Sequence, residues 1–249
     1  MAAPTSVIDS YPTSEELLEA ALGYARTGWG VFPLHTPING VCDCPKGPAC
    51  TSPGKHPRTL NGLKDATTDE LRIRRWWKTY SIANIGVAVP EGYVIVDVDG
   101  AEGWTALKNA QRGLPATAVQ TTGRGSHYVY RTLDRIPPRS GLMEKVDLRG
   151  PGSYIVGAPS VHASGSVYRW EISLEQVDIA PDWLVEAGKH SGGTHDGARS
   201  PVDFAVLLAG IPEGQRKWEL YRAASKLRAA DVPVDIAVML AVQAADQCI

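Results

Sequence analysis

The chain has 249 residues, of which 43% are hydrophobic and 21% charged, with a formal net charge of −2. This composition is ordinary for one large globular domain, or for a large domain with a smaller one. It excludes a histone-like polycation, although a local basic patch would still suffice for nucleic-acid binding. Apolar runs are too short to cross a bilayer and Met1–Pro12 do not resemble a secretion signal, so we expect a cytoplasmic protein with no membrane partner.

Hydrophobic periodicity and end signals predict a mixed α+β chain. In chain order we expect a helix over 14–28, a strand over 29–34, an irregular loop over 36–62, a helix over 68–79, strands over 84–89 and 93–98, a helix over 101–112, strands over 116–121 and 126–131, and short strands over 146–148, 153–158 and 167–170. Ser14 and Thr68 are the expected N-caps of the first two helices.

The loop over 36–62 contains a cluster of potential metal ligands, Cys42, Cys44, Cys50 and His56. Three thiolates and one imidazole suit tetrahedral Zn²⁺, and a zinc ion would order a loop that is rich in Pro and Gly. The spacing is not that of a common zinc finger. Free buried thiols with a surface histidine are the alternative, and His35 is a possible replacement ligand.

Seven basic residues lie between Lys55 and Lys78, interleaved with Trp76 and Trp77. Such a stretch can bind nucleic acid, because phosphates attract the cations and bases stack on aromatic rings. We favour an amphipathic helix whose charged face is solvated and whose tryptophans anchor it in the core.

The run Gly92–Gly100 is an apolar strand that ends in two aspartates. Alternate residues of a strand share a face, so Asp97 and Asp99 point one way while Val96 and Val98 point into the core. Neighbouring carboxylates suit a hard divalent cation such as Mg²⁺ or Mn²⁺. A solvated turn or a helix N-cap is the alternative interpretation.

Asp147 lies in a second short apolar strand, with Arg149 on the same face. A third carboxylate would complete an oxygen-rich site for two divalent ions, which can activate a hydroxyl group and stabilise the leaving oxygen of a phosphoryl transfer. On its own, Asp147 would equally well be a paired surface carboxylate.

The turn Gly123–Gly125 lies between two expected strands and precedes His127. Its backbone and Arg124 could bind phosphate oxygens, and His127 could donate a hydrogen bond to them. A plain hairpin turn is the alternative. Ser160 and His162, in a loop that leaves a later strand, are either sugar or phosphate contacts or turn residues.

Residues 189–200 have the composition of a flexible linker. Beyond them, three Ala- and Leu-rich helices are expected over 202–209, 214–230 and 233–247. The last of these runs almost to Ile249 without a cap or polar tail, so we expect the chain to be part of a longer protein.

Taken together, Val94–Gly100, Thr122–His127 and Val146–His162 resemble three ordered motifs of the bifunctional primase–polymerase (Prim-Pol) domains of the archaeo-eukaryotic primase superfamily. These domains stand at the N-termini of phage and plasmid replication proteins. The resemblance covers about residues 14–188. The family's middle motif is commonly Ser-x-His, whereas here Gly125 occupies the serine position.

The resemblance implies roles for the residues singled out above. Asp97, Asp99 and Asp147 would bind two Mg²⁺ or Mn²⁺ ions, and His127 would contact the triphosphate of the incoming nucleotide. The further candidate nucleotide contacts are Arg124, Ser126, Arg149, Ser160 and His162.

The resemblance also implies an architecture. The fold would be α+β, with an archaeo-eukaryotic primase-type catalytic core whose sheet is like that of the RNA-recognition motif, an N-terminal α/β unit and a zinc-stapled loop. The catalytic domain would span 1–188, followed by the linker over 189–200. A small C-terminal helical segment, 201–249, would lead to a helicase domain.

The activity implied is that of a DNA primase and DNA polymerase. It would make and extend primers on a single-stranded DNA template from NTPs or dNTPs, in phage or plasmid replication within a bacterial host cell. Two alternatives are a non-catalytic zinc-containing DNA-binding module that recruits a helicase, and a metal-dependent sugar transferase that uses Asp-x-Asp.

Overall fold

The computed structural model describes residues 11–189. The chain divides into two compact units, Met1–Gly193 and Thr194–Ile249, and the fold below is that of the first. The linker predicted from residue 189 lies outside the described residues except for Lys189, and the helices predicted from residue 202 lie wholly outside them. Within the described part, no helix has the length and apolar character needed to span a membrane.

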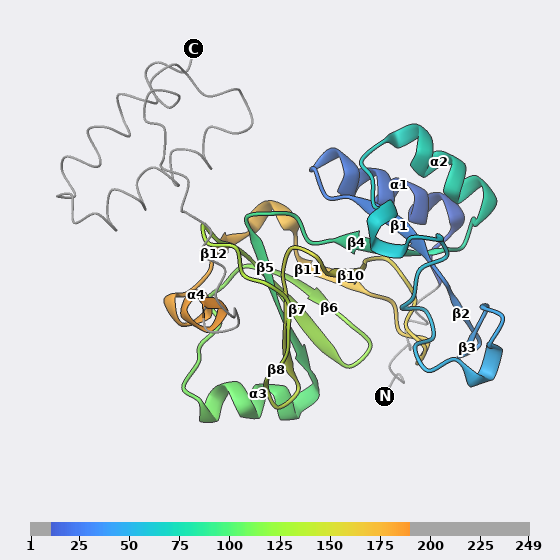
Figure 1. Ribbon diagram of the computed structural model, residues 1–249. Helices are drawn as coiled ribbons and strands as arrows, with labels where there is room; N and C mark the ends of the chain where they lie inside the picture. Colours follow the sequence, from blue (N-terminus) through green and yellow to red (C-terminus); the bar gives the residue numbers. More distant parts are fainter. Residues whose placement is uncertain (1–10, 190–249) are drawn as a thin grey trace, which may run out of the picture. The chain divides into compact units, whose positions relative to one another are not determined.

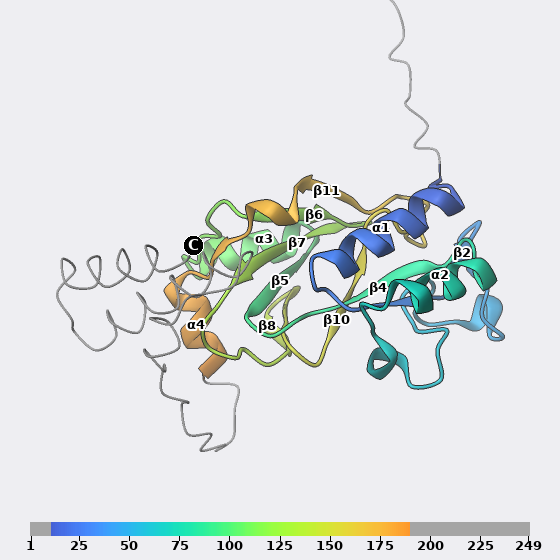
Figure 2. The ribbon, with the colours of Figure 1, turned by 90° about the horizontal axis from the view of Figure 1, so that it is seen from above.

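A small antiparallel sheet forms one half of this unit, with β4 (Asn84–Ala88) between β1 (Val31–Leu34) and β10 (Tyr154–Gly157). Two helices, α1 (Ser14–Arg26) and α2 (Glu70–Thr79), lie next to β1 and β4 (Figures 1 and 2). All four residues of β1 are buried, as are four of the five in β4, so this sheet is interior rather than half-solvated.

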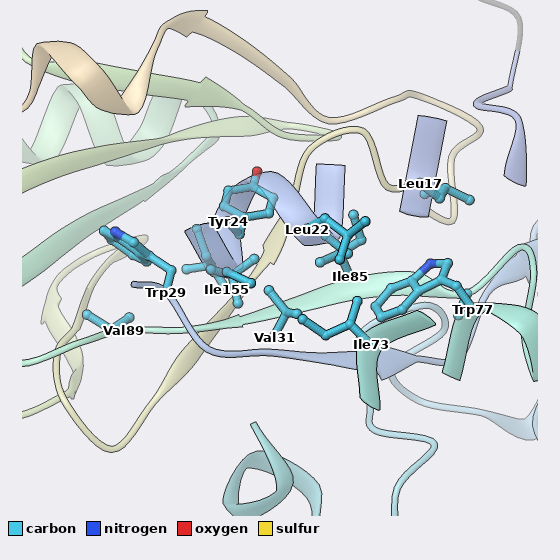
Figure 3. Packing of buried hydrophobic residues seen from close by; sticks show 14 of the residues in the cluster. Leu17, Leu22, Tyr24, Trp29, Val31, Ile73, Trp77, Ile85, Val89 and Ile155 are labelled. Carbon is cyan, nitrogen blue, oxygen red and sulfur yellow. The ribbon is translucent and has the colours of Figure 1, made fainter. Parts of the chain in front are cut away.

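The helices and the small sheet share one apolar core (Figure 3). Leu22 of α1 and both Ile73 and Trp77 of α2 pack around Val31 and Ile85 of the strands, and all five side chains are 3% exposed or less. The amphipathic patterns of the two helices are therefore satisfied by one shared hydrophobic surface.

A larger, almost wholly antiparallel sheet forms the other half, in the order β11-β6-β7-β5-β9-β8, while β12 adds a short parallel pairing to β7. Its strands are β5 (Tyr93–Asp99), β6 (Ala118–Thr121), β7 (Gly125–Arg131), β8 (Arg139–Met143), β9 (Val146–Arg149), β11 (Arg169–Ile172) and β12 (Asp178–Ile179). The central strand β5 is paired on both sides, by β7 and β9.

One face of the larger sheet is covered by α3 (Gly100–Asn109) and α4 (Asp182–Lys189), which lie on the side of the molecule away from α1 and α2 (Figure 1). Val96 and Val98 of β5 pack there with Leu107 of α3 and Leu184 of α4. On the other face, Ile95, Ala118 and Val129 join the apolar core that contains α1 and α2. Asp97 lies on that same face, two residues beyond Ile95, because side chains alternate along the strand.

The expected irregular loop over 36–62 contains some regular structure. Two strands of two residues each, β2 (Pro37–Ile38) and β3 (Val41–Cys42), pair in a hairpin. Two short 3-10 helices follow, η1 (Gly47–Ala49) and η2 (Gly62–Asp65). A third 3-10 helix, η3 (Leu174–Gln176), precedes β12.

Two predicted helix caps are each wrong by one residue. Thr13, not Ser14, caps α1, because only Thr13 has a glutamate three residues on, and Glu16 returns a hydrogen bond to the Thr13 amide in a capping box. Asp69, not Thr68, caps α2, because its carboxylate accepts hydrogen bonds from the first-turn amides.

The basic stretch from Lys55 to Lys78 has the predicted structural character over α2. Trp77 is buried in the core, and the Arg72 guanidinium lies 4.7 Å from the centre of the half-buried Trp76 ring. The predicted mixture of helices and strands is confirmed, whereas the likeness of the larger sheet to an RNA-recognition motif stays a prediction.

Candidate active site and metal-binding loop

Strand pairing brings together the predicted catalytic residues of three separate strands. Asp97 of β5 stands opposite His127 of β7 on one side and opposite Asp147 of β9 on the other. Directly opposed residues lie on the same face of a sheet, so the three side chains form one cross-strand row. Asp99 shares this face two residues further along β5, and the prediction that Val96 and Val98 are buried behind it is confirmed.

The guanidinium group of Arg149 lies between two of the three carboxylates. It donates to Asp97 Oδ2 from Nε at 3.2 Å and from Nη2 at 3.0 Å, and to Asp147 Oδ2 from Nη2 at 2.8 Å. Asp147 also accepts a hydrogen bond of 2.7 Å from the Gly141 amide. The repulsion expected between carboxylates in one row is thus offset by a cation that belongs to the chain.

The same contacts explain the acidity of Asp97. Burial on its own would raise the pKa of this carboxyl group, but hydrogen bonding and charge from His127 and Arg149 outweigh it and lower the pKa to about 2. Asp97 is therefore an anion at any physiological pH, as a ligand for a divalent cation has to be.

His127 contacts Asp97 through one ring nitrogen and a buried side chain through the other. Its Nε2 lies 3.4 Å from Asp97 Oδ1, while its Nδ1 lies 2.9 Å from the side-chain amide nitrogen of Gln120 in β6. Sequence reasoning missed Gln120. Its signal is a polar residue at a strand position that shares its phase with the buried Ala118.

Asp99 differs from Asp97 in being exposed at the end of β5. It occupies the N-cap position of α3, but its side chain makes no capping hydrogen bond to that helix. This geometry removes the helix-cap interpretation and leaves the carboxylate facing a cleft.

Two side chains of the row, those of Asp97 and His127, line an open cleft of about 430 Å³, within the size range of small-molecule sites. Asp97, Asp99, His127 and Arg149 form part of its wall. Lys55, which sequence reasoning counted only as one of seven basic residues, also lines the cleft, together with Tyr154, Tyr168 and several smaller groups.

Ser126 is placed differently from the prediction. It neighbours His127 in β7 and therefore points to the opposite face of the sheet, where it lies next to Tyr128. The glycine at the preceding position also has a physical reason. A Cβ atom on Gly125 would overlap with the carbonyl oxygen of Val98 in β5, so this backbone cannot hold the serine that the family pattern places there.

Ser160 also lies elsewhere than predicted. Its side chain is fully buried, and its hydroxyl accepts a hydrogen bond of 2.8 Å from the Ile85 amide in β4, so it braces the small sheet instead of facing the cleft. Ser160 follows Pro159 in a bend after β10, where the sequence alone does not reveal which way a small polar side chain turns.

His162 does lie beside the turn Gly123–Gly125. A Cβ atom on Gly123 would overlap with the His162 ring, so the ring packs directly on the turn backbone. Burial, with the charges of Lys55 and Arg124, lowers the pKa of His162, while Asp99 opposes the shift. The cations Lys55 and Arg124 and the carboxylate of Asp99 therefore share one neighbourhood with this imidazole.

The cysteine cluster is assembled as predicted. The ligand atoms of Cys42, Cys44, Cys50 and His56 lie within 4.8 Å of one another, and the Sγ atoms of Cys42 and Cys50 are each 3.4 Å from His56 Nε2. Three sulfurs and one imidazole nitrogen fit a tetrahedral Zn²⁺ ion by number and type.

His35, the possible replacement ligand, has another partner. Its Nδ1 lies 2.8 Å from Asp43 Oδ1, and its ring stacks on His56 at 4.5 Å between centroids. The structure thus favours His56 as the fourth group, with the His35–Asp43 pair supporting it from the side. His35 joins only a second, mixed group with Cys42 and Asp43.

Within residues 11–189, Asp97, Asp99 and Asp147 do not form a ligand cluster as tight as the one around His56. Their side chains share one face of the sheet, but Asp147 is not among the residues that line the cleft, and the guanidinium of Arg149 occupies the space between Asp97 and Asp147. Carboxylate oxygens on a rigid strand remain the donor set that Mg²⁺ and Mn²⁺ prefer.

Comparison with known proteins gives one family. A family model described as "Bifunctional DNA primase/polymerase, N-terminal" matches residues 21–183, which is more than half of the chain and includes the cleft and the cysteine cluster. No curated protein matches the chain.

Proposed function

Because the chain belongs to the Prim-Pol family of bifunctional DNA primases/polymerases, we propose that it makes and extends primers on single-stranded DNA by two-metal nucleotidyl transfer in the cleft around Asp97. The family assignment confirms the resemblance drawn from the three motifs. The observation that carries the proposal is the cross-strand row of Asp147, Asp97 and His127, with Arg149 between the carboxylates.

In the proposed reaction, a 3′-hydroxyl oxygen forms a bond to the α-phosphorus of a nucleoside triphosphate, and the bond to the β-phosphate oxygen breaks, releasing pyrophosphate. Bound by Asp97, Asp99 and Asp147, two Mg²⁺ or Mn²⁺ ions would favour loss of the hydroxyl proton and neutralise charge on the phosphates. The remaining work of the chain is positioning and charge compensation.

Several residues can take up the nucleotide's negative charge. Arg149 reaches into the cleft from β9, and Lys55 lines its wall. Arg124 and His162 lie at the turn beside Asp99. We propose these residues and His127 as triphosphate contacts, and we omit Ser126 and Ser160 because their hydroxyls face elsewhere.

We propose a structural zinc ion for the loop over 36–62. The support is the donor set of Cys42, Cys44, Cys50 and His56, and the scarcity of other packing in the loop, where η1 has no buried residue. A metal would supply the cohesion that a hydrophobic core supplies elsewhere.

The wider setting is also a proposal. The partners would be a single-stranded DNA template, NTPs or dNTPs, and a helicase domain in cis, within a phage or plasmid replication system in the cytoplasm of a bacterial host. The N-terminal position in the family description agrees with a further domain downstream.

Incubation of the full chain with labelled nucleoside triphosphates, Mn²⁺ or Mg²⁺, and an unprimed single-stranded DNA template tests this function. Metal-dependent labelled products of several nucleotides are expected, and a chelator should abolish them. Template binding without any incorporation on unprimed or primed DNA would contradict the proposal and favour a non-catalytic DNA-binding module.

A further inference from the structure

Gln120 is a fully buried polar side chain that contacts His127 of the proposed site. It lies in β6 directly opposite His127, and its side chain is 0% exposed. A buried amide without hydrogen-bond partners would destabilise the fold, because it loses its hydrogen bonds to water. Its hydrogen bonds are therefore informative about its neighbours.

Two backbone groups of the small sheet fix the orientation of this amide. Gln120 Oε1 accepts a hydrogen bond of 2.7 Å from the Ala158 N–H, and Nε2 donates one of 2.9 Å to the Val156 carbonyl oxygen. A backbone N–H can only donate and a carbonyl oxygen can only accept, so rotating the amide by half a turn would lose both bonds.

The second hydrogen on Gln120 Nε2 then has one destination, His127 Nδ1 at 2.9 Å. That ring nitrogen has to accept, and a neutral imidazole that accepts at Nδ1 carries its hydrogen on Nε2. Nε2 is the nitrogen that faces Asp97 and the cleft, at 3.4 Å from Asp97 Oδ1.

We propose that Gln120 is a positioning residue that holds His127 in the Nε2–H tautomer, so that the imidazole presents a donor to the cleft. Two consecutive hydrogen bonds, from Gln120 to the Val156 carbonyl and from Gln120 to His127, link the backbone of the small sheet to a side chain of the larger sheet. The tautomer follows from the hydrogen bonds alone, whereas the use of that donor on a phosphate oxygen rests on the proposed function.

The direct test is the nitrogen spectrum of the His127 ring in the isotope-labelled full chain, in mildly alkaline metal-free buffer. The resonances are assigned by their loss in His127→Asn. In the unsubstituted protein we expect the proton on Nε2 and a bare Nδ1. A proton on Nδ1, or an even mixture of the two tautomers, would overturn the proposal without any variant of Gln120.

Gln120→Glu supplies the second arm. Its carboxylate would accept a hydrogen bond from Nδ1–H, so Nδ1 should gain a proton in the nitrogen spectrum, while template binding stays the same. Asn84→Asp is the matched control, because Asn84 is a buried amide that pins the backbone groups of Gly54 and Val161 and does not contact His127.

An Nδ1 that stays bare in a folded Gln120→Glu variant would show that residue 120 does not control the protonation of this ring nitrogen, and would overturn the proposal. If the unsubstituted protein incorporates no nucleotide, the proposed function fails, but the nitrogen spectrum still decides the role of Gln120.

Discussion

Arg149 links two carboxylates of the candidate active site. It contacts Asp97 and Asp147 at 3.0 and 2.8 Å, and both the guanidinium and the carboxylates remain partly exposed. An arginine can give up one carboxylate to a divalent cation and turn its planar fork toward a phosphate, which it matches geometrically. The same side chain therefore has the chemistry to bind either a carboxylate or a phosphate.

The low pKa of Asp97 predicts a specific pH dependence of stability. Because its pKa is about 2 in the folded chain against an ordinary 3.8, Asp97 stabilises the fold above pH 3.8, and this contribution is lost as the pH falls through about 2. The loss amounts to about 2 kcal/mol.

Urea unfolding in chelator, at neutral pH and near pH 3, of the unsubstituted chain and Asp97→Asn measures this contribution. The variant should be less stable at neutral pH, and the gap between the two proteins should narrow in acid. A gap that stays constant or widens toward low pH would contradict the assigned role of Arg149 and His127.

At this scale, period-two alternation was enough to predict that Asp97 and Asp99 share a face. The same alternation means that Ser126 and His127, as neighbours in one strand, point to opposite faces. The prediction of Ser126 as a nucleotide contact followed the family motif and disregarded this. Ser160 could not be placed from sequence, since its direction depends on the long-range contact with Ile85. Gln120 carries no motif and becomes visible only once β6 and β7 are paired.

At the scale of elements, the close pairing of β5 and β7 explains the glycine in the family's serine position. A Cβ atom at Gly125 would overlap with the carbonyl oxygen of Val98. Gly125→Ala should therefore lower the free energy of unfolding by about 1–3 kcal/mol, as overpacking does.

Gly113→Ala is the matched control, because a Cβ atom there meets nothing within 4 Å. Thermal unfolding measures the melting temperatures of the two variants, and Gly125→Ala should melt at the lower temperature. Equal melting temperatures would mean that β5 and β7 are further apart than described.

The loop over 36–62, which carries the cysteine cluster, is connected to the cleft wall by a hydrogen bond of 2.8 Å from the Tyr154 hydroxyl to the Lys55 carbonyl oxygen. Lys55 precedes His56, and both Lys55 and Tyr154 line the cleft. Loss of a metal from the loop should therefore disturb nucleotide binding as well as the loop itself.

Cys50→Ser should lose the zinc measured by elemental analysis, become sensitive to proteolysis within residues 36–62, and show a KM for nucleotide raised several-fold. Ser52→Ala, in the same loop but outside the cluster, should retain the metal and the KM. Stoichiometric zinc in Cys50→Ser, or its absence from the freshly purified unsubstituted chain, would contradict the proposed site.

Long periodic elements such as α1, α2 and β5 were predictable from sequence, to within two residues of their ends. The hairpin of β2 and β3 was not, because its strands have two residues each and no period can be read from them. The short strands β8 and β12 were missed for a related reason, since β8 contains Gly141 in the left-handed region and both lie at edges of the pairing.

At the scale of the whole molecule, both sheets contribute residues to the candidate active site. The larger sheet provides Asp97, Asp147 and His127, while the small sheet, through Val156 and Ala158, holds the amide behind His127. The cleft takes its walls from both sheets and from the cysteine loop.

The order of motifs along the chain predicted which residues would meet, but not how. The strands that carry Asp97 and Asp147 are neighbours although about fifty residues separate them, and β6 is separated from β5 by β7. Such pairings are set by long-range contacts, which no local pattern encodes.

The central claim is that the aspartates of β5 carry a metal-dependent nucleotidyl transfer, and primer synthesis on an unprimed single-stranded template by Asp97→Ala/Asp99→Ala tests it most directly. The matched control is Asp134→Ala/Glu175→Ala, which removes two exposed carboxylates away from the cleft. Synthesis should be lost in the first protein, with template binding retained, and should be unchanged in the second. Undiminished synthesis by Asp97→Ala/Asp99→Ala would contradict the account.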